Sequence, residues 1–334
     1  MAGRKALNRL IKQLLDKHDK DIEAVFLAAV QGRVDGISFR DLERAIEARD
    51  FDRVITIVGL SRADLFALDT AIMAAFVEGG QTVSMAAPAF AVAFGFDGRA
   101  TGAATWARDH VGGLVTNIIA DQRDAIREVV SKQVFDGIGP RKAAIQIAGR
   151  VTPKGRVGGI VGLSKPQASY LMNARAELEG LNSAYFGRKL RDRRFDGLVK
   201  RAVAAGKPLS AVDVDRITQR YSDRMLKHRA DTIARTESIA ALRAGRREGI
   251  EQAIEQGAIG GRAIKRVWSA TLDSRTRPDH VAMDNKAVNG MDAPFVLPDG
   301  SMMRYPGDTS MGASAAQTIA CRCYDEYVVD WLTR

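Results

Sequence analysis

The sequence is poor in cysteine and in aromatic residues. Its only two cysteines, Cys321 and Cys323, stand one residue apart in a chain of 334 residues, and such a pair cannot comfortably close a disulfide. A disulfide framework is therefore excluded, and we expect a protein made in a reducing compartment. Aromatic residues make up 6% of the chain, and their scarcity beside frequent alanine and arginine favours helices.

Long apolar runs are also missing. No uncharged apolar stretch reaches the roughly 18 residues that a membrane-spanning helix needs, so we expect no transmembrane segment. The N-terminal stretch MAGRKALNRLIKQLLDKHDK is basic, but charges interrupt its apolar residues. It lacks the continuous apolar core of a secretory signal and predicts an amphipathic helix instead.

Charge is distributed unevenly along the chain. The formal net charge is +10, yet residues 236–334 hold 12 basic and 13 acidic residues. Residues 184–235 alone hold 14 basic and 6 acidic residues. Such a concentration of positive charge attracts polyanions and suits contacts with phosphate groups. The alternative is a solvated helix face that carries unpaired arginines.

Length and composition indicate a soluble globular protein of two or three folding units. Hydrophobic residues are 46% and charged residues 27% of the chain, which is ordinary for such proteins. Proline divides the chain, because only Pro88 precedes Pro140, whereas four prolines fall between 278 and 306. A helical region followed by a turn-rich region is therefore expected.

Apolar spacing and capping residues predict helices over most of the first 256 residues. Ser38 with Asp41 marks one helix start, and Ser164 with Pro166 marks another. Gly79 and Gly80 are expected to end a helix that begins at Ser61. The apolar, glycine-interrupted stretch 85–103 is expected to be a connector. The predicted helices lie at about 6–15, 21–30, 38 onward, 61–77, 103–135 (one helix, or two broken at 112–113), 165–178, 210 onward and 223–256.

The pattern changes after Gly260. Residues 263–272 are strand-like, and Thr276 with Asp279 forms a capping-box pattern that predicts a short helix over 277–285. The stretch FVLPDGSMMRYPGD predicts two strands joined by a turn, and residues 321–329 predict a last strand. The fold class expected is a mainly α N-terminal region followed by a small α+β domain with an antiparallel meander. The ranges expected are 1–183 (helical), 184–260 (basic and helical) and 261–334 (α+β).

Polar and special residues concentrate in the C-terminal domain, and a metal site is one interpretation. Zn²⁺ prefers thiolate and imidazole ligands in a tetrahedron, which Cys321, Cys323 and His280 could supply. A fourth ligand could come from Asp273, Asp284 or Asp308. However, the two side chains of a C-x-C pair on a strand share one face about 7 Å apart. This spacing argues against an ordinary zinc knuckle unless the backbone bends there.

Two other interpretations remain open. A cysteine paired with His280, or His280 acting as a base beside Asp273 or Asp279, would make a hydrolytic site. Alternatively, Asp273 caps a turn, Arg275 and Arg277 bind carboxylates, and the cysteines pack as small core residues. Residue chemistry alone favours this structural clamp.

Three stretches together resemble the phage head morphogenesis family typified by the phage Mu F protein. They are IARTESIAALRAGRREG, VWSATLDSRTRPDHVAMD and RYPGDTSMGASAAQTIACRC, within roughly residues 231–324. The motif residues are Arg235, Thr236 and Glu237; Trp268; Asp273, Arg275, Thr276 and His280; Pro306, Gly307 and Asp308; and Cys321, Arg322 and Cys323. One departure is Ala320, where members often carry asparagine.

The resemblance implies a minor head protein of a tailed phage or a gene transfer agent. It would be made in the bacterial cytoplasm and lie in the virion, inside the capsid near the portal. It would act in head assembly and in DNA packaging or ejection by binding, without a cofactor. The implied partners are the portal protein, packaged double-stranded DNA and the major capsid or scaffold protein. The alternative is a C-terminal domain that binds metal or hydrolyses nucleic acid or a host target.

The basic segment then has an expected ligand. Packaged DNA would be held through its phosphates without reading of the bases. The residues expected to contact phosphate are Arg188, Lys189, Arg191, Arg193, Arg194, Lys200 and Arg201.

Overall fold

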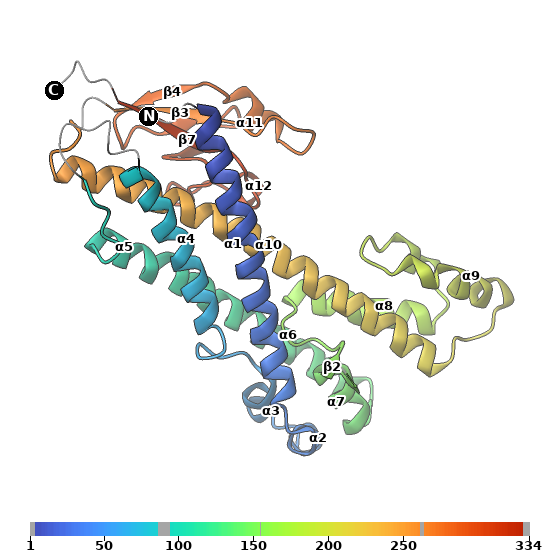
Figure 1. Ribbon diagram of the computed structural model, residues 1–334. Coiled ribbons are helices and arrows are strands. Elements are labelled where there is room, and N and C mark those ends of the chain that lie inside the picture. Colours follow the sequence, from blue (N-terminus) through green and yellow to red (C-terminus); the bar gives the residue numbers. More distant parts are fainter. Residues whose placement is uncertain (1–3, 86–93, 154, 261–263, 330–334) are drawn as a thin grey trace. The chain divides into compact units, whose positions relative to one another are not determined.

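A computed structural model describes residues 4–85, 94–153, 155–260 and 264–329 of the chain (Figure 1). The chain forms two compact units, each built from segments that are distant in sequence. We call residues 1–23, 68–112 and 231–334 the sheet unit, and residues 24–67 and 113–230 the helical unit. Helices α1 (Arg4–Asp35) and α10 (Ala211–Glu255) each contribute residues to both units. The three contiguous ranges expected from the sequence stay a prediction.

The helical unit contains short helices and one small hairpin. Two predicted helix starts are confirmed in it: the Ser38 hydroxyl accepts the N–H of Asp41, and Ser164 forms a capping box with Gln167, followed by Pro166 in the first turn. Besides parts of α1 and α10, its elements are α2 (Phe39–Glu47), α3 (Phe51–Val58), α6 (Gly112–Phe135), α7 (Pro140–Ala148), β1 (Arg150–Thr152), β2 (Gly155–Val157), α8 (Lys165–Glu179), η3 (Ser183–Gly187), η4 (Arg193–Phe195) and α9 (Asp196–Ala205).

The sheet unit combines helices with two small antiparallel sheets. The first sheet has the strand order β4–β3–β7, so the last strand returns to pair with β3, and the second is the β5–β6 pair. Its other elements are α4 (Phe66–Met85), α5 (Thr101–Trp106), the π-helix η2 (Ala107–Val111), α11 (Pro278–Ala282) and α12 (Ala315–Thr318). The strands are β3 (Ile264–Ser269), β4 (Ala287–Asn289), β5 (Phe295–Val296), β6 (Met302–Met303) and β7 (Tyr324–Val329). The expected fold class, a mainly helical region followed by small antiparallel sheets, is confirmed.

Several predicted helix boundaries are wrong. Helix α4 begins at Phe66 and continues through Gly79 and Gly80 to Met85. Of the two alternatives for residues 103–135, the single helix is found: residues 101–135 are continuously helical, with a π-helical turn directly before Gly112 and Gly113. The pairs of helices expected around residues 6–30 and 210–256 are each a single helix. Residues 86–93 of the expected connector at 85–103 lie outside the described residues, and α5 starts at Thr101.

The glycines of α4 and α10 have a packing role. A Cβ added to Gly79 would overlap the carbonyl oxygen of Leu242, and one added to Gly245 would overlap the carbonyl oxygen of Phe76. The two helix backbones therefore approach closely enough that no side chain fits between them. Because this constraint comes from a contact between helices distant in sequence, local propensity does not reveal it.

We predict that Gly245→Ala destabilises the protein by about 1–3 kcal/mol, because the added methyl group forces α4 and α10 apart. Gly113→Ala is the matched control, since it also lies in a helix but has no atom within 4 Å of the added Cβ. The free energy of unfolding of the control should rise by about 0.5–1 kcal/mol, because alanine favours a helix more than glycine does. Urea unfolding of the two variants measures both effects, and equal stability of the two would contradict the close-packing account.

Candidate functional site

The loop between β3 and α11 is a hydrogen-bonded turn. The Thr276 hydroxyl donates to the carbonyl of Thr271, and the Asp273 carboxylate accepts the backbone N–H of Arg275 at 2.9 Å. The predicted capping box of Thr276 and Asp279 is wrong. The N-cap of α11 is Arg277, which has no side-chain cap, and the helix covers only Pro278–Ala282. Thr276 stands one residue too early and stabilises the turn instead.

Asp273 joins this turn to the Cys-Arg-Cys segment. The Arg322 guanidinium donates two parallel hydrogen bonds to its carboxylate, at 2.5 and 2.6 Å. These bonds, and then the Arg275 N–H, hold the pKa of Asp273 well below its usual range. Arg275 is largely exposed, and Arg277 donates to the Ile319 carbonyl at 2.6 Å. Asp273 is therefore bound mainly by Arg322, with Arg275 as a looser ion-pair partner at 3.9 Å, and Arg277 binds a backbone carbonyl instead of a carboxylate.

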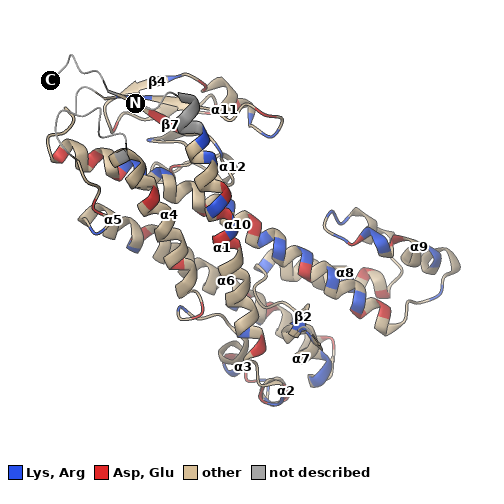
Figure 2. Cartoon of the chain, viewed as in Figure 1, with Lys and Arg blue, Asp and Glu red and all other residues tan. Residues whose placement is uncertain are grey.

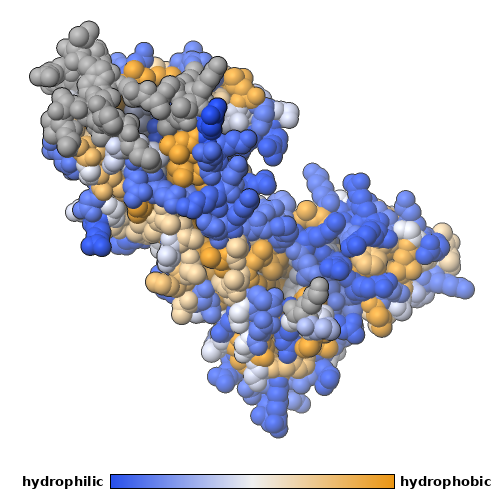
Figure 3. Space-filling view, in the orientation of Figure 1, coloured by the Kyte–Doolittle hydropathy of each residue, from blue (hydrophilic) through white to orange (hydrophobic). Residues whose placement is uncertain are grey.

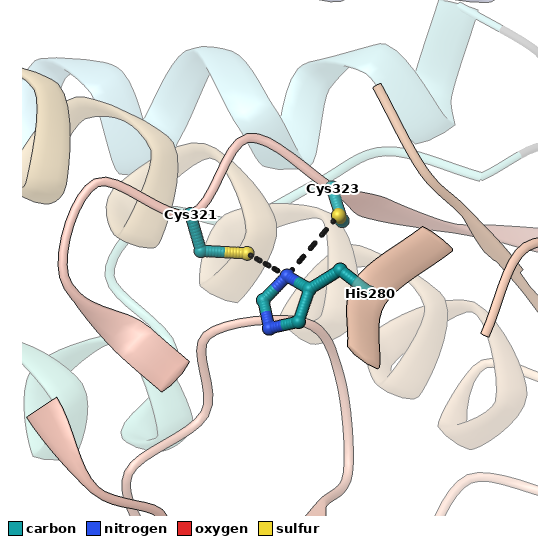
Figure 4. A group of neighbouring side chains, drawn as sticks. All are labelled: His280, Cys321 and Cys323. Atoms are coloured by element: carbon teal, nitrogen blue, oxygen red, sulfur yellow. Dashed lines mark hydrogen bonds between the residues drawn. The ribbon is translucent and has the colours of Figure 1, made fainter. Parts of the chain in front are cut away.

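The two cysteines lie in irregular backbone before β7, which begins at Tyr324. The expectation that they belong to the last strand, with side chains about 7 Å apart along one face, is wrong. Ala320 has a left-handed φ of 51° and turns the chain immediately before Cys321. Both sulfurs consequently point at one atom, the Nδ1 of His280, at 3.6 Å for Cys321 and 3.5 Å for Cys323 (Figure 4).

The three side chains form a buried cluster. His280 and Cys321 are 1% exposed and Cys323 is 2% exposed. A hydrogen bond from Cys323 lowers the pKa of the Cys321 thiol, and the Arg243 and His280 side chains also favour its thiolate. The neighbouring thiolate and burial raise the pKa of Cys323. The three side chains therefore interact with one another in a site that solvent barely reaches.

Arg243 of α10 is the buried cation beside the cysteines. Its Nη2 donates to the carbonyl oxygens of Cys321, at 2.9 Å, and of Cys323, and lies 3.7 Å from the Cys321 sulfur. Its Nη1 faces Gly307, where an added Cβ would lie 2.5 Å away. The Pro-Gly-Asp turn is held in place by Asp308, which accepts the N–H groups of Arg304 and Ser310.

Further buried arginines repeat this mode of binding. Arg246 donates to the Asp325 carbonyl at 3.1 Å, and Arg247 donates to the Met291 carbonyl at 2.5 Å. On β3, Arg266 is fully buried and donates to three carbonyls, among them that of Gly290 at 2.7 Å. The sequence interpretation missed these arginines. The spacing of positions 243, 246 and 247, which places them on one helical face, was the available signal.

The remaining motif residues connect the helices to the same region. The Thr236 hydroxyl accepts the backbone N–H of Ala320 at 3.2 Å, and Glu237 binds the His110 ring at 2.7 Å. Arg235 is exposed. The buried ring of Trp268 lies edge-on to the His280 ring, with their centroids 5.5 Å apart. The structure thus gathers the cysteines, His280, Trp268, Thr236 and the Pro-Gly-Asp turn around one small core.

Of the pairs that the hydrolytic interpretation offered, the cysteines and His280 lie together, at 3.6 and 3.5 Å, whereas Asp273 and His280 do not. Among the described residues, no hydrogen bond joins Asp273 to His280: Asp273 is bound by Arg322, and the His280 Nε2 lies 3.0 Å from the Oε1 of Gln317. Gln317 is buried and was missed from the sequence. It is one of several polar residues between the Pro-Gly-Asp and Cys-Arg-Cys motifs, and nothing in the local pattern distinguishes it.

The seven basic residues expected to bind phosphate lie on α9 and the turns before it. Arg188 forms a two-bond pair with Glu177 at 2.6 and 2.7 Å, and Arg191 forms one with Asp196 at 3.0 and 2.9 Å. These two arginines are 13% exposed. Figure 2 shows Lys and Arg positions in blue along this segment, and in Figure 3 hydrophilic residues gather over the α8 and α9 region with apolar patches between them. The exposed members are Lys189, Arg193, Arg194, Lys200 and Arg201.

Residues 194–325 match the family described as phage Mu protein F like protein, and this segment is therefore a Mu F-like domain. It includes α9, α10 and β3 to β6 and ends at the second residue of β7, so it begins earlier than the motifs indicated. The minor head protein GP7 of Bacillus phage SPP1 is 35% identical over 116 residues, which are 34% of this chain and 35% of that protein. The alignment thus spans about a third of the relative's length.

No solved structure matches the chain. Among the helices of the described residues, none combines the length and the apolar character needed to cross a membrane.

We predict that Ala320→Gly stabilises the protein by about 1 kcal/mol, because a left-handed backbone is unfavourable for residues with a Cβ. Ala316→Gly is the matched control, since Ala316 is exposed in the neighbouring helix α12. In this helix the change from alanine to glycine should lower the free energy of unfolding by up to about 1 kcal/mol. The denaturant concentration at the midpoint of unfolding measures both effects, provided that the slope m of each variant is unchanged. Destabilisation by Ala320→Gly would show that the turn depends on the methyl group.

Proposed function

We propose that this chain is a minor head protein of a tailed phage or a gene transfer agent, acting in head morphogenesis by binding. The match of residues 194–325 to the Mu F-like family carries this proposal. The similarity to a phage minor head protein supports it. The site is consistent with a binding role, because the motif side chains mostly bond to one another and to backbone carbonyls.

The proposal extends to location and partners. The protein lies inside the capsid near the portal, and its partners are the portal protein, packaged DNA and the major capsid or scaffold protein. The division of the chain into 1–183, 184–260 and 261–334 remains part of this proposal, with the first range docking on the portal or capsid. The protein's contact with DNA acts during packaging or ejection of the DNA.

DNA contact is assigned to the exposed basic residues of the 188–201 segment. Arg188 and Arg191 already use their guanidinium groups on Glu177 and Asp196, so they order the turns before α9. Arg194 is 74% exposed although it binds Asp192, and phosphate can compete for its remaining donors. Lys189, Arg193, Lys200 and Arg201 are exposed, and they are the main proposed phosphate ligands.

Replacing Lys189, Arg193, Lys200 and Arg201 together with alanine should weaken binding to double-stranded DNA of any sequence. Each phosphate contact contributes about 0.9 to the slope of log affinity against log salt, so the slope should become shallower by up to about 3.6. Fluorescence anisotropy with two unrelated duplexes over a salt series measures this.

A second quadruple variant controls for net charge. Arg40, Arg44, Arg141 and Lys142 are also exposed in the helical unit, and their replacement removes the same charge. This control should bind DNA almost as the unaltered protein does. Equal loss in both variants, or binding that ignores salt, would show that the 188–201 segment is not a phosphate site.

Portal association is tested by co-purification. The full chain should elute with the portal protein of the same phage or gene transfer agent after nuclease treatment, because the proposed contact is between proteins. Co-elution that disappears on nuclease treatment would indicate that DNA alone bridges the two, and absence of co-elution in both conditions would reject portal binding.

A further inference from the structure

We propose that His280, Cys321 and Cys323 form a Zn²⁺ site in the Mu F-like domain. Their ligand atoms, one imidazole nitrogen and two sulfurs, all lie within 4.8 Å of one another. With Zn–S bonds of about 2.3 Å and a Zn–N bond of about 2.0–2.1 Å in a tetrahedron, sulfur and nitrogen stand about 3.6 Å apart. The two separations found are 3.6 and 3.5 Å.

Hydrogen bonding alone accounts poorly for this arrangement. Figure 4 shows both sulfurs directed at the same Nδ1 atom of His280. A neutral imidazole nitrogen has one in-plane lone pair, which can accept one good hydrogen bond. Two thiols at equal distance therefore compete for one acceptor, whereas a metal ion between the three atoms satisfies all of them.

Gln317 fixes the tautomer of His280 that a metal requires. Its Nε2 donates to the carboxylates of Asp279 at 2.8 Å and Asp299 at 2.7 Å. Carboxylates accept, so the NH₂ group must face them, and the Oε1 atom must face the His280 Nε2, 3.0 Å away. The Nε2 therefore carries the proton, and the Nδ1 lone pair is left for the ion. Metal-binding histidines commonly have such a partner on the other ring nitrogen.

A positive charge stands beside one of the two sulfurs. The Arg243 Nη2 lies 3.7 Å from the Cys321 sulfur, where it would stabilise a metal-bound thiolate. Two thiolates balance the charge of one Zn²⁺, so the buried site is neutral apart from Arg243. The Cys-x-Cys pair can bind one metal ion here because the left-handed turn at Ala320 directs both sulfurs to the same point.

Three protein ligands leave one position of the tetrahedron, which a water molecule can take. The metal would fasten α11 to the segment before β7, across a cluster of buried residues that contains Trp268 and Phe295. We infer a structural role for the ion, because the ligands are almost fully buried.

The test is metal analysis of the full chain, purified without chelator from zinc-supplemented cells. We expect close to one zinc per chain. After removal of metal under reducing conditions, titration with Co²⁺ should produce the visible bands of a tetrahedral ion and near-ultraviolet thiolate charge transfer. Absence of both zinc and Co²⁺ bands in the folded protein would overturn the proposal, and so would bands without thiolate charge transfer.

Variants identify the ligands. Cys321→Ser with Cys323→Ser should remove zinc, and Gln317→Leu should weaken zinc binding by about 10–100-fold because the imidazole loses its partner. Met303→Leu is the control, since Met303 is fully buried in the same cluster but offers no ligand. The control should keep its zinc. Retention of zinc by the double serine variant would refute the assignment, and the Co²⁺ spectrum of the unaltered protein decides the case if that variant does not fold.

Discussion

The C-terminal region depends on the buried guanidinium of Arg243. A buried arginine is costly unless its donors are used, and this one binds the carbonyls of Cys321 and Cys323 while lying against Gly307. Carbonyl groups just outside a strand lack ladder partners, so the arginine replaces hydrogen bonds that the irregular backbone cannot make for itself. The same contact brings the Pro-Gly-Asp turn and the Cys-Arg-Cys segment to one helix.

Helix α10 can contact both the C-terminal backbone and α4 because it carries arginines on one face and glycines on the opposite face. At about 100° per residue, Arg243, Arg246 and Arg247 fall on one side, and Gly245 and Gly249 fall on the other. The arginines bind the C-terminal backbone. The glycines allow close approach of α4, since a Cβ on Gly249 would lie 3.0 Å from the Gly80 carbonyl oxygen. One short stretch, RAGRREG, therefore fixes both neighbours of the helix.

Features that depend on neighbouring residues were predictable, and features that depend on distant contacts were not. The hydroxyls of Ser38 and Ser164 accept backbone N–H groups three residues further along the chain, so the sequence located both starts. Gly79 and Gly80 resemble a helix end, but an added Cβ would overlap α10 at Gly79 and the ring of Phe96 at Gly80. Thr276 matches a capping pattern, yet the carbonyl of Thr271 captures its hydroxyl. For the site, His280 and the cysteines were recognised as a set, whereas their convergence required the left-handed turn at Ala320, which alanine does not signal.

The size of the C-terminal sheets explains why polar contacts dominate this region. The sheets have three and two strands, several of them only two or three residues long. Such short strands bury little apolar surface and leave many carbonyl groups outside regular ladders, so packing alone stabilises them weakly. Buried arginines and the Asp273–Arg322 pair act on this problem in the same way: they join loops to one another where strands are too short to do so. The proposed metal ion would add a third such link. The concentration of motif residues in loops is the consequence, because in this domain the loops carry the interactions that hold the fold.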